Sequence, residues 1–143
     1  MFVSQVLKAK GDLVFTASPQ ETVAAAAALL CTRRVGAMVI VDGMDAVVGI
    51  LSERDIVRAV AERGPSALTQ PISSWMSTDV VFACPDETVA ALLERMTDRR
   101  IRHLPVLKDE RLAGIVSIGD LVKSKIAEAE AEAETLKAYI AAG

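Results

Sequence analysis

The sequence is poor in the residue types that build most metal centres and catalytic sites. Its 143 residues include one histidine and two cysteines. Metal sites and catalytic triads need several such groups close together. Cys31 and Cys84 lack the close spacing of a zinc site or a redox dithiol, and free cysteines are mostly buried, so we expect two buried apolar side chains. The sequence therefore predicts no catalytic residues, no metal site and no enzyme.

Long apolar runs and an excess of positive charge are also missing. Although 52% of the residues are apolar, no run approaches the roughly 20 residues of a membrane-spanning helix. The N-terminal residues do not have the layout of a secretory signal. A net charge of −3 offers no broad electrostatic surface for nucleic acid. We expect a soluble, cytoplasmic protein that binds neither membranes nor nucleic acid.

The sequence does contain an internal repeat. The segment "SPQETVAAAAALL" from Ser18 aligns with "CPDETVAALLERM" from Cys84, and "GILSERD" from Gly49 aligns with "GIVSIGD" from Gly114. In each copy a short leading helix, an extended entry, a helix, two apolar strands joined by a turn and a second helix give the order βαββα. About 60 residues are marginal alone. We therefore expect an α+β fold with two copies, residues 1–65 and 66–126, packed as a pseudo-two-fold pair, plus a helical extension over 127–143.

Both copies carry the motif Ser-x-x-Asp at the start of their second helix, at Ser52 and Asp55 and at Ser117 and Asp120. One interpretation is a capping box, in which serine and acid satisfy each other's backbone N–H groups. The other interpretation is that the same motif also binds a ligand. A helix N-terminus with a serine hydroxyl can bind phosphate, a carboxylate can accept both hydroxyls of a ribose, and the preceding glycine lets a base approach the backbone.

The repeated unit resembles a known family. The segments "SPQETV…RRVGAMVIVD…GILSERDIV" and "CPDETV…RIRHLPVL…GIVSIGDLV" look like a tandem pair of cystathionine β-synthase (CBS) domains, or Bateman module, of the free-standing bacterial type, over residues 1–126. The resemblance implies a regulatory protein that senses energy or redox state by binding an adenosine nucleotide in clefts between the copies. It would have no catalytic cofactor. AMP is expected first, with ADP, ATP, NAD and S-adenosylmethionine as alternatives.

The resemblance implies that one cleft is the stronger. Asp120 would bind the ribose, Ser117 would face the phosphate, and Ile115 would face the base. The other expected members are Ser18 at the entry, Val35, Gly36 and Ala37 along the adenine, and Arg102 and His103 near the phosphate.

The mirror cleft is expected to bind more weakly. Its expected members are Ile50, Ser52, Arg54 and Asp55 with Ile101 and His103. Cys84 stands where the stronger cleft has Ser18, and Gly36 and Ala37 stand where it has the basic pair. This cleft therefore lacks the obvious phosphate ligands, for which Arg54 could partly compensate. From the residues alone, Arg102 is an ordinary solvated charge and His103 caps a strand edge or bridges to a carboxylate. Their alignment with a cleft favours the binding role.

The C-terminal residues predict a long helix, since alanine, glutamate, lysine and leucine dominate them. Its apolar positions are spaced by four and three residues in turn, as in a coiled-coil seam: Val122, Ile126, Ala129, Ala133, Leu136 and Ile140. Such a helix can fold back on its own chain or pair with a second one. We expect a homodimer, which the family resemblance also implies.

Three functions are therefore open. The first is a nucleotide sensor that changes its packing when the ligand binds. The second is a dimerisation or interaction module that binds no ligand, in which the Ser-x-x-Asp motifs only cap helices. The third, a small enzyme that processes nucleotides, has little support in the sequence.

Overall fold

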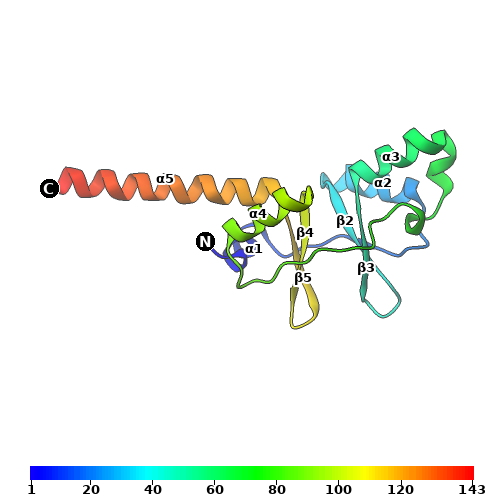
Figure 1. Ribbon diagram of the computed structural model, residues 1–143, viewed down its shortest axis with the longest axis horizontal. Helices are drawn as coiled ribbons and strands as arrows, with labels where there is room; N and C mark the ends of the chain where they lie inside the picture. Colours follow the sequence, from blue (N-terminus) through cyan, green and yellow to red (C-terminus); the bar gives the residue numbers. More distant parts are fainter. The chain divides into compact units, whose positions relative to one another are not determined.

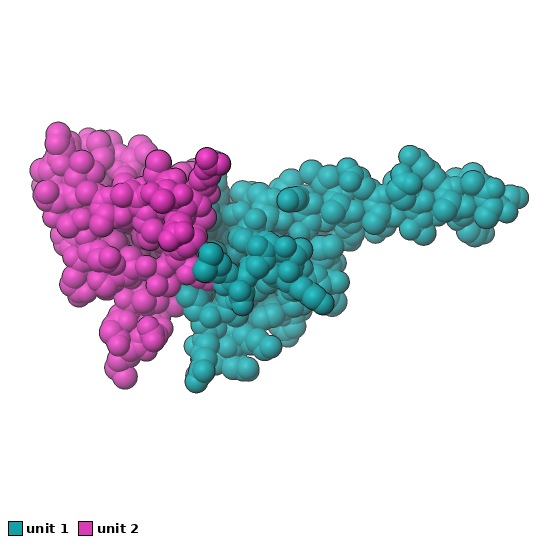
Figure 2. Space-filling model, turned by 180° about the vertical axis from the view of Figure 1, so that it is seen from behind, with its two compact units in different colours: residues 1–13, 82–143 teal, residues 14–81 magenta.

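A computed structural model describes all 143 residues, which form two compact units. Unit 1 contains residues 1–13 and 82–143, and unit 2 contains residues 14–81 (Figure 2). These units differ from the linear repeats because the leading segment of each repeat belongs to the unit of the other repeat. The N-terminal helix α1 (Val3–Lys10) is therefore part of unit 1.

Unit 2 is a three-stranded sheet covered by helices (Figure 1). Its elements are β1 (Thr16–Ala17), α2 (Val23–Arg33), β2 (Ala37–Val41), β3 (Val47–Ser52), α3 (Glu53–Arg63) and the 3-10 helices η1 (Gly64–Thr69) and η2 (Ile72–Ser74). The strand order is β1-β2-β3, with β1 parallel to β2 and β2 antiparallel to β3. The predicted βαββα order is confirmed here.

Unit 1 repeats this arrangement around a second hairpin. Its elements after α1 are α4 (Val89–Arg99), β4 (His103–Lys108), β5 (Arg111–Ser117) and α5 (Ile118–Ala142). The place of β1 is taken by a single parallel bridge between Ala83 and Val106. Because β4 pairs antiparallel with β5, both units have the same hairpin followed by a helix. The α+β class and the long C-terminal helix are confirmed.

The repeat extends to details of the backbone. Thr22 and Thr88 cap α2 and α4, each accepting a backbone N–H at 3.1 Å. Both helices end at an arginine in the left-handed conformation, Arg34 with φ 55° and Arg100 with φ 54°. Similar sequences in the two copies therefore produce similar caps, because caps depend on only a few neighbouring residues.

Buried side chains hold each leading segment in the unit of the other repeat. Ile72 and Trp75, in the leading segment of the second repeat, belong to the core of unit 2 with Met38, Ile40 and Leu51. The sequence predicts a helix around Ile72, but the structure has only the short 3-10 turn η2 there. In unit 1, the Val3 N–H donates to the Glu87 carbonyl at 2.9 Å. Each leading segment thus closes the core of the other repeat.

The two repeated glycines are explained by this packing. A Cβ atom at Gly114 would lie 2.7 Å from Leu7 of α1, and one at Gly49 would lie 2.6 Å from the sulfur of Met76. Side chains of the leading segments lie where a Cβ atom would project, so both glycines permit close packing within their unit.

The prediction of two buried cysteines is also wrong. Cys31 and Cys84 are both exposed. Cys31 lies on α2, whose buried face is formed by Val23, Ala26 and Leu30. None of the helices combines the length and the apolar character that crossing a membrane requires.

Candidate functional site

The open end of each hairpin meets the first turn of the following helix. In unit 1, His103 on β4 is the register partner of Ser117 at the end of β5. The Ile118 N–H at the start of α5 donates to the Arg102 carbonyl at 2.8 Å. The hairpin therefore brings the backbone of Arg102 and His103 beside Ser117 and the first turn of α5, which carries Asp120. We call these four residues the Asp120 corner.

The Ser-x-x-Asp motif in this corner is a complete capping box. The Asp120 N–H donates to the Ser117 hydroxyl at 3.1 Å, and the Ser117 N–H donates to Oδ2 of Asp120 at 2.8 Å. The capping interpretation is confirmed. It fixes the carboxylate of Asp120 on the first turn of α5 and does not by itself exclude a ligand.

Lys10, at the end of α1, brings a further charge to the Asp120 corner. Its ammonium donates to Oδ2 of Asp120 at 2.5 Å and to the Ile115 carbonyl at 2.8 Å. The side chains of Lys10 and Asp120 are 31% and 25% exposed, so solvent reaches both groups. Both the Lys10 and Ser117 bonds go to Oδ2, and Oδ1 takes part in neither.

The contacts of Asp120 favour its ionised form. Partial burial alone would raise the pKa of this carboxyl group, but the hydrogen bonds from Lys10 and Ser117, together with the charge of Lys10, lower the pKa below its ordinary value. Because the folded state then binds a proton less readily than the unfolded state, Asp120 stabilises the fold at neutral pH. This contribution is lost as the pH falls through the pKa of the folded state.

We expect Lys10→Met to raise the pKa of Asp120, because the variant loses both the hydrogen bond and the positive charge. An ion pair of this exposure contributes about 0.2–1 kcal/mol at neutral pH, so the fold should remain intact. The carboxyl carbon resonance of Asp120, followed by NMR during a pH titration, measures the change. Lys8→Met, on the same helix, is the matched control and should leave the titration unchanged. An unchanged titration in Lys10→Met would contradict the contact.

Unit 2 has a corresponding corner with different contacts. Ala37 is the register partner of Ser52, and the Glu53 N–H donates to the Gly36 carbonyl at 2.9 Å. Here Oδ2 of Asp55 accepts from the Ser52 N–H at 2.9 Å, while Oδ1 accepts from Arg58 at 3.3 Å. Both oxygens of this carboxylate are therefore engaged within the unit.

The lysine contact is absent from the unit 2 corner for a reason visible in the sequence. The buried pairs of the two leading segments, Val3 with Ile72 and Val6 with Trp75, are offset by 72 − 3 = 69 and 75 − 6 = 69 residues. The same offset places Asp79 at the position that corresponds to Lys10, since 10 + 69 = 79. Aspartate cannot donate to a second carboxylate, so the two corners differ in charge.

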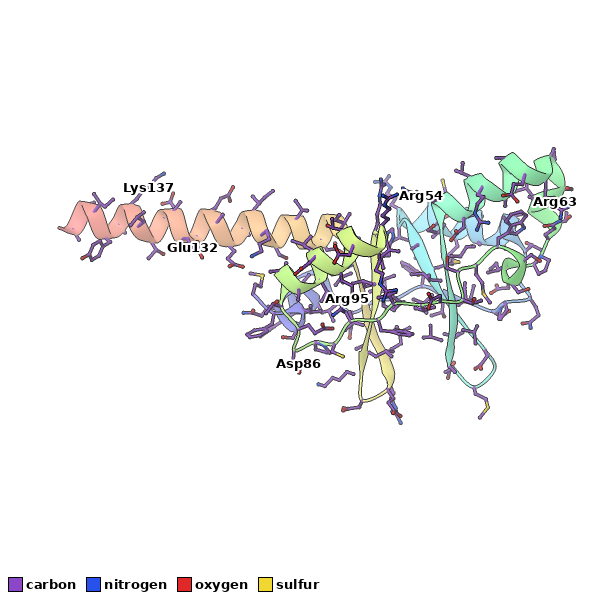
Figure 3. The ribbon with its side chains drawn as sticks, in the orientation of Figure 1. Arg54, Arg63, Asp86, Arg95, Glu132 and Lys137 are labelled. Atoms are coloured by element: carbon purple, nitrogen blue, oxygen red, sulfur yellow. The ribbon has the colours of Figure 1, made fainter.

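The predicted site residues are divided between the two units. Unit 1 holds Ile101, Arg102, His103, Ile115, Ser117 and Asp120, and unit 2 holds Ser18, Val35, Gly36, Ala37, Ile50, Ser52, Arg54 and Asp55. The side chains of Arg102 and Arg54 are exposed, and that of His103 is half-buried (Arg54 is labelled in Figure 3).

Ser18 does not join the corner of unit 2. The pairing of Ala17 with Ile40 places Ser18 toward the β2–β3 turn, whereas Gly36 and Ala37 lie at the other end of β2. The Ser18 N–H instead donates to the Glu21 carboxylate at 2.6 Å. Cys84 repeats this bond with Glu87 at 2.9 Å, so both positions organise the turn before a helix.

Lys10 is the functional candidate that the sequence analysis missed. It lies in the leading segment of the first repeat, 110 residues from Asp120, and it belongs to no motif. The only signal is indirect: the apolar spacing of the leading helix is repeated, but the charge that follows it changes sign between Lys10 and Asp79.

Comparison with known proteins agrees with this duplicated architecture. The family model described as "CBS domain" matches residues 11–62 and 72–126. The CBS domain-containing protein CBSX3, mitochondrial, of Arabidopsis thaliana is 34% identical, and the match covers 99% of this chain and 72% of that protein. The crystal structure of the CBS-domain protein ATU1752 from Agrobacterium tumefaciens is 43% identical with a TM-score of 0.85, covering 87% of this chain and 92% of the other.

A further solved structure contains adenosine compounds. The CBS domain pair of protein MJ0100, solved in complex with 5-methylthioadenosine and S-adenosyl-L-methionine, is 26% identical with a TM-score of 0.80. The match covers 90% of this chain and 98% of that one. With two family segments and two hairpin-to-helix corners of the same construction, the chain belongs to the CBS domain family as a tandem pair.

Proposed function

We propose that this protein is a regulator that binds an adenosine nucleotide through the Asp120 corner. The observation that carries the proposal is an ionised, partly exposed carboxylate that is fixed on the first turn of α5 and paired with Lys10. The pKa of Asp120 is lowered, and Lys10 donates to it. Arg102 is exposed, and its backbone carbonyl accepts from the Ile118 N–H at the start of the same helix. Carboxylate oxygens accept ribose hydroxyls, and the cations attract phosphate.

We propose a role for each residue of the site, as the family resemblance implies. The ribose would bind Asp120, the phosphate would bind near Ser117, Arg102 and His103, and the base would lie along Ile115. Ribose hydroxyls would compete with Lys10 for Asp120 and release its ammonium toward the phosphate. AMP is the ligand that we propose first, before ADP, ATP, NAD and S-adenosylmethionine.

The site formed by Asp55 would bind more weakly. Arg58 already occupies Oδ1 of Asp55 and also donates to the Trp75 carbonyl at 3.1 Å. A ribose would have to displace a guanidinium that is held at two points. Arg54 is the remaining cation of this site for a phosphate, and Ile50 and Ser52 are its other proposed members.

We further propose that two copies associate. Each unit presents an apolar stripe on the helix that follows its Ser-x-x-Asp motif: Val57 and Val60 on α3 are 68% and 43% exposed, and Val122 and Ile126 on α5 are 44% and 54% exposed. Repeated exposed stripes of this kind mark interaction surfaces. Nucleotide binding would change such an assembly only if the nucleotide binds two arrangements of the copies with different affinities. We place this sensor in the cytoplasm.

The test is thermal unfolding of the purified protein with millimolar AMP, ADP, ATP, NAD or S-adenosylmethionine. A ligand present at 100 times its dissociation constant adds about 2.7 kcal/mol, which should raise the unfolding temperature by several degrees. CMP, which carries the same ribose phosphate without adenine, is the control. If no adenosine compound shifts the transition, the interaction module without a ligand becomes the better interpretation, because the capping boxes are complete on their own.

A further inference from the structure

The C-terminal helix α5 exposes a continuous apolar stripe. Leu121, on one face of the helix, is fully buried within unit 1, whereas Val122 on the neighbouring face is 44% exposed. The stripe continues through Ile126, Leu136 and Ile140, which are 54%, 59% and 67% exposed, and includes the exposed Ala129 and Ala133. This is the predicted seam.

The chain's own unit does not cover this seam. Every residue from Ala129 to the C-terminus is exposed, and α5 extends past the other elements of unit 1 (Figures 1 and 2). From Val122 to Ile140 the seam is about 27 Å long at 1.5 Å per residue. An apolar stripe of that length on a projecting helix requires a partner.

The charges beside the seam distinguish between pairing directions. One flank carries Lys123, Glu130 and Lys137, and the other carries Lys125 and Glu132. Figure 3 shows Glu132 and Lys137 on different sides of the helix. In coiled coils, the residues that flank the seam form pairs between helices and set their orientation.

A parallel pair of α5 helices in register gives opposite charges at both flanking contacts. Lys125 faces Glu130 of the partner subunit, and Glu132 faces Lys137 of the partner subunit. The antiparallel pair that keeps the seam together sets Ala129 against Ala133 of the partner subunit. Lys123 then faces Lys137 of the partner subunit. Glu130 faces Glu130 of the partner subunit, and Glu132 faces Glu132 of the partner subunit, so like charges meet at each contact. Like charges at these positions destabilise pairing about as much as opposite charges stabilise it.

We infer that two copies of this chain pair through α5 as a parallel, in-register coiled coil. The two copies of unit 1, each with its Asp120 corner, then lie side by side. This inference rests on the association proposed above, and it adds the orientation of the two chains. It does not depend on which nucleotide binds.

Charge reversal tests the orientation. We expect Glu132→Lys to weaken dimerisation about tenfold in sedimentation equilibrium, since two contacts change from attraction to repulsion. Lys137→Glu should weaken it similarly, and the double variant should restore the wild-type constant. Glu134→Lys is the matched control: it makes the same charge change and removes the intrahelical contact with Lys137 at 3.7 Å, but it lies away from the seam and should leave dimerisation unchanged.

Cysteine cross-linking gives an independent readout. The exposed Cys31 and Cys84 are first replaced by serine. In that background, Ala129→Cys should form a disulfide between two copies, because residue 129 meets residue 129 only in the parallel arrangement. Ala138→Cys, on the opposite face of α5, should remain reduced under the same conditions.

The possible results are distinct. Disulfide formation only when Ala129→Cys is mixed with Ala133→Cys, or tighter association of Lys137→Glu, would overturn the parallel orientation while leaving the association itself intact. A wild-type protein that is monomeric at all concentrations would overturn both. Nucleotide-dependent stabilisation of that monomer would still support the proposed ligand function.

Discussion

Asp120→Ala is expected to weaken the binding of adenosine nucleotide roughly 10- to 100-fold. A hydrogen bond to a charged group contributes about 1.5–3 kcal/mol, and each 1.4 kcal/mol corresponds to about a factor of ten in affinity. Asp120 also fixes Ser117 through the capping box and holds Lys10, so its removal disturbs the groups proposed for phosphate as well. Isothermal titration calorimetry with AMP, well below the unfolding temperature, measures the loss.

Asp55→Ala is the matched control. It removes the same capping contact in the other unit, where Oδ2 of Asp55 accepts from the Ser52 N–H, so loss of the cap should cost about 1 kcal/mol of stability in both variants. We expect the affinity of the stronger site to change less than about threefold, because Asp55 is proposed to serve the weaker site. Equal losses of affinity would show that the effect comes from the helix cap and not from ribose binding.

Ile72→Ala is expected to cost about 2–5 kcal/mol of the free energy of unfolding, as for other fully buried large apolar residues. Ile72 has no exposed surface and belongs to the core of unit 2, although it lies in the leading segment of the second repeat. The amide hydrogens of β2, at Met38 and Ile40, should therefore exchange faster. Native-state hydrogen exchange and urea denaturation measure the two effects.

Leu68→Ala provides the comparison within the same unit, since Leu68 is 38% exposed and its truncation should cost less than about 1 kcal/mol. The contrary result would be a loss of protection in β4, at Leu104 and Val106, with β2 unchanged. That pattern would mean that the leading segment stabilises its own repeat and not the other one.

The features set by neighbouring residues could be read from the sequence. Thr22 and Thr88 cap their helices, Ser52 and Ser117 begin the next ones, and the tail is a continuous helix. Capping, turns and helix propensity each depend on a few adjacent residues. A duplicated pattern of such signals was therefore enough to predict the βαββα units and the exposed seam.

The partners of distant residues were decided only by the tertiary structure. The sequence placed α1 with the first repeat, and only the packed chain sets Leu7 against Gly114 and Lys10 against Asp120. Cys31 was expected in a core and lies on an exposed face of α2. Apolar contacts are non-directional and long-range in sequence, so periodicity identifies a buried face without naming what covers it. The sequence by itself therefore determined the repeated elements and their caps, while the packed chain decided which leading segment closes which core and which charge lies beside Asp120.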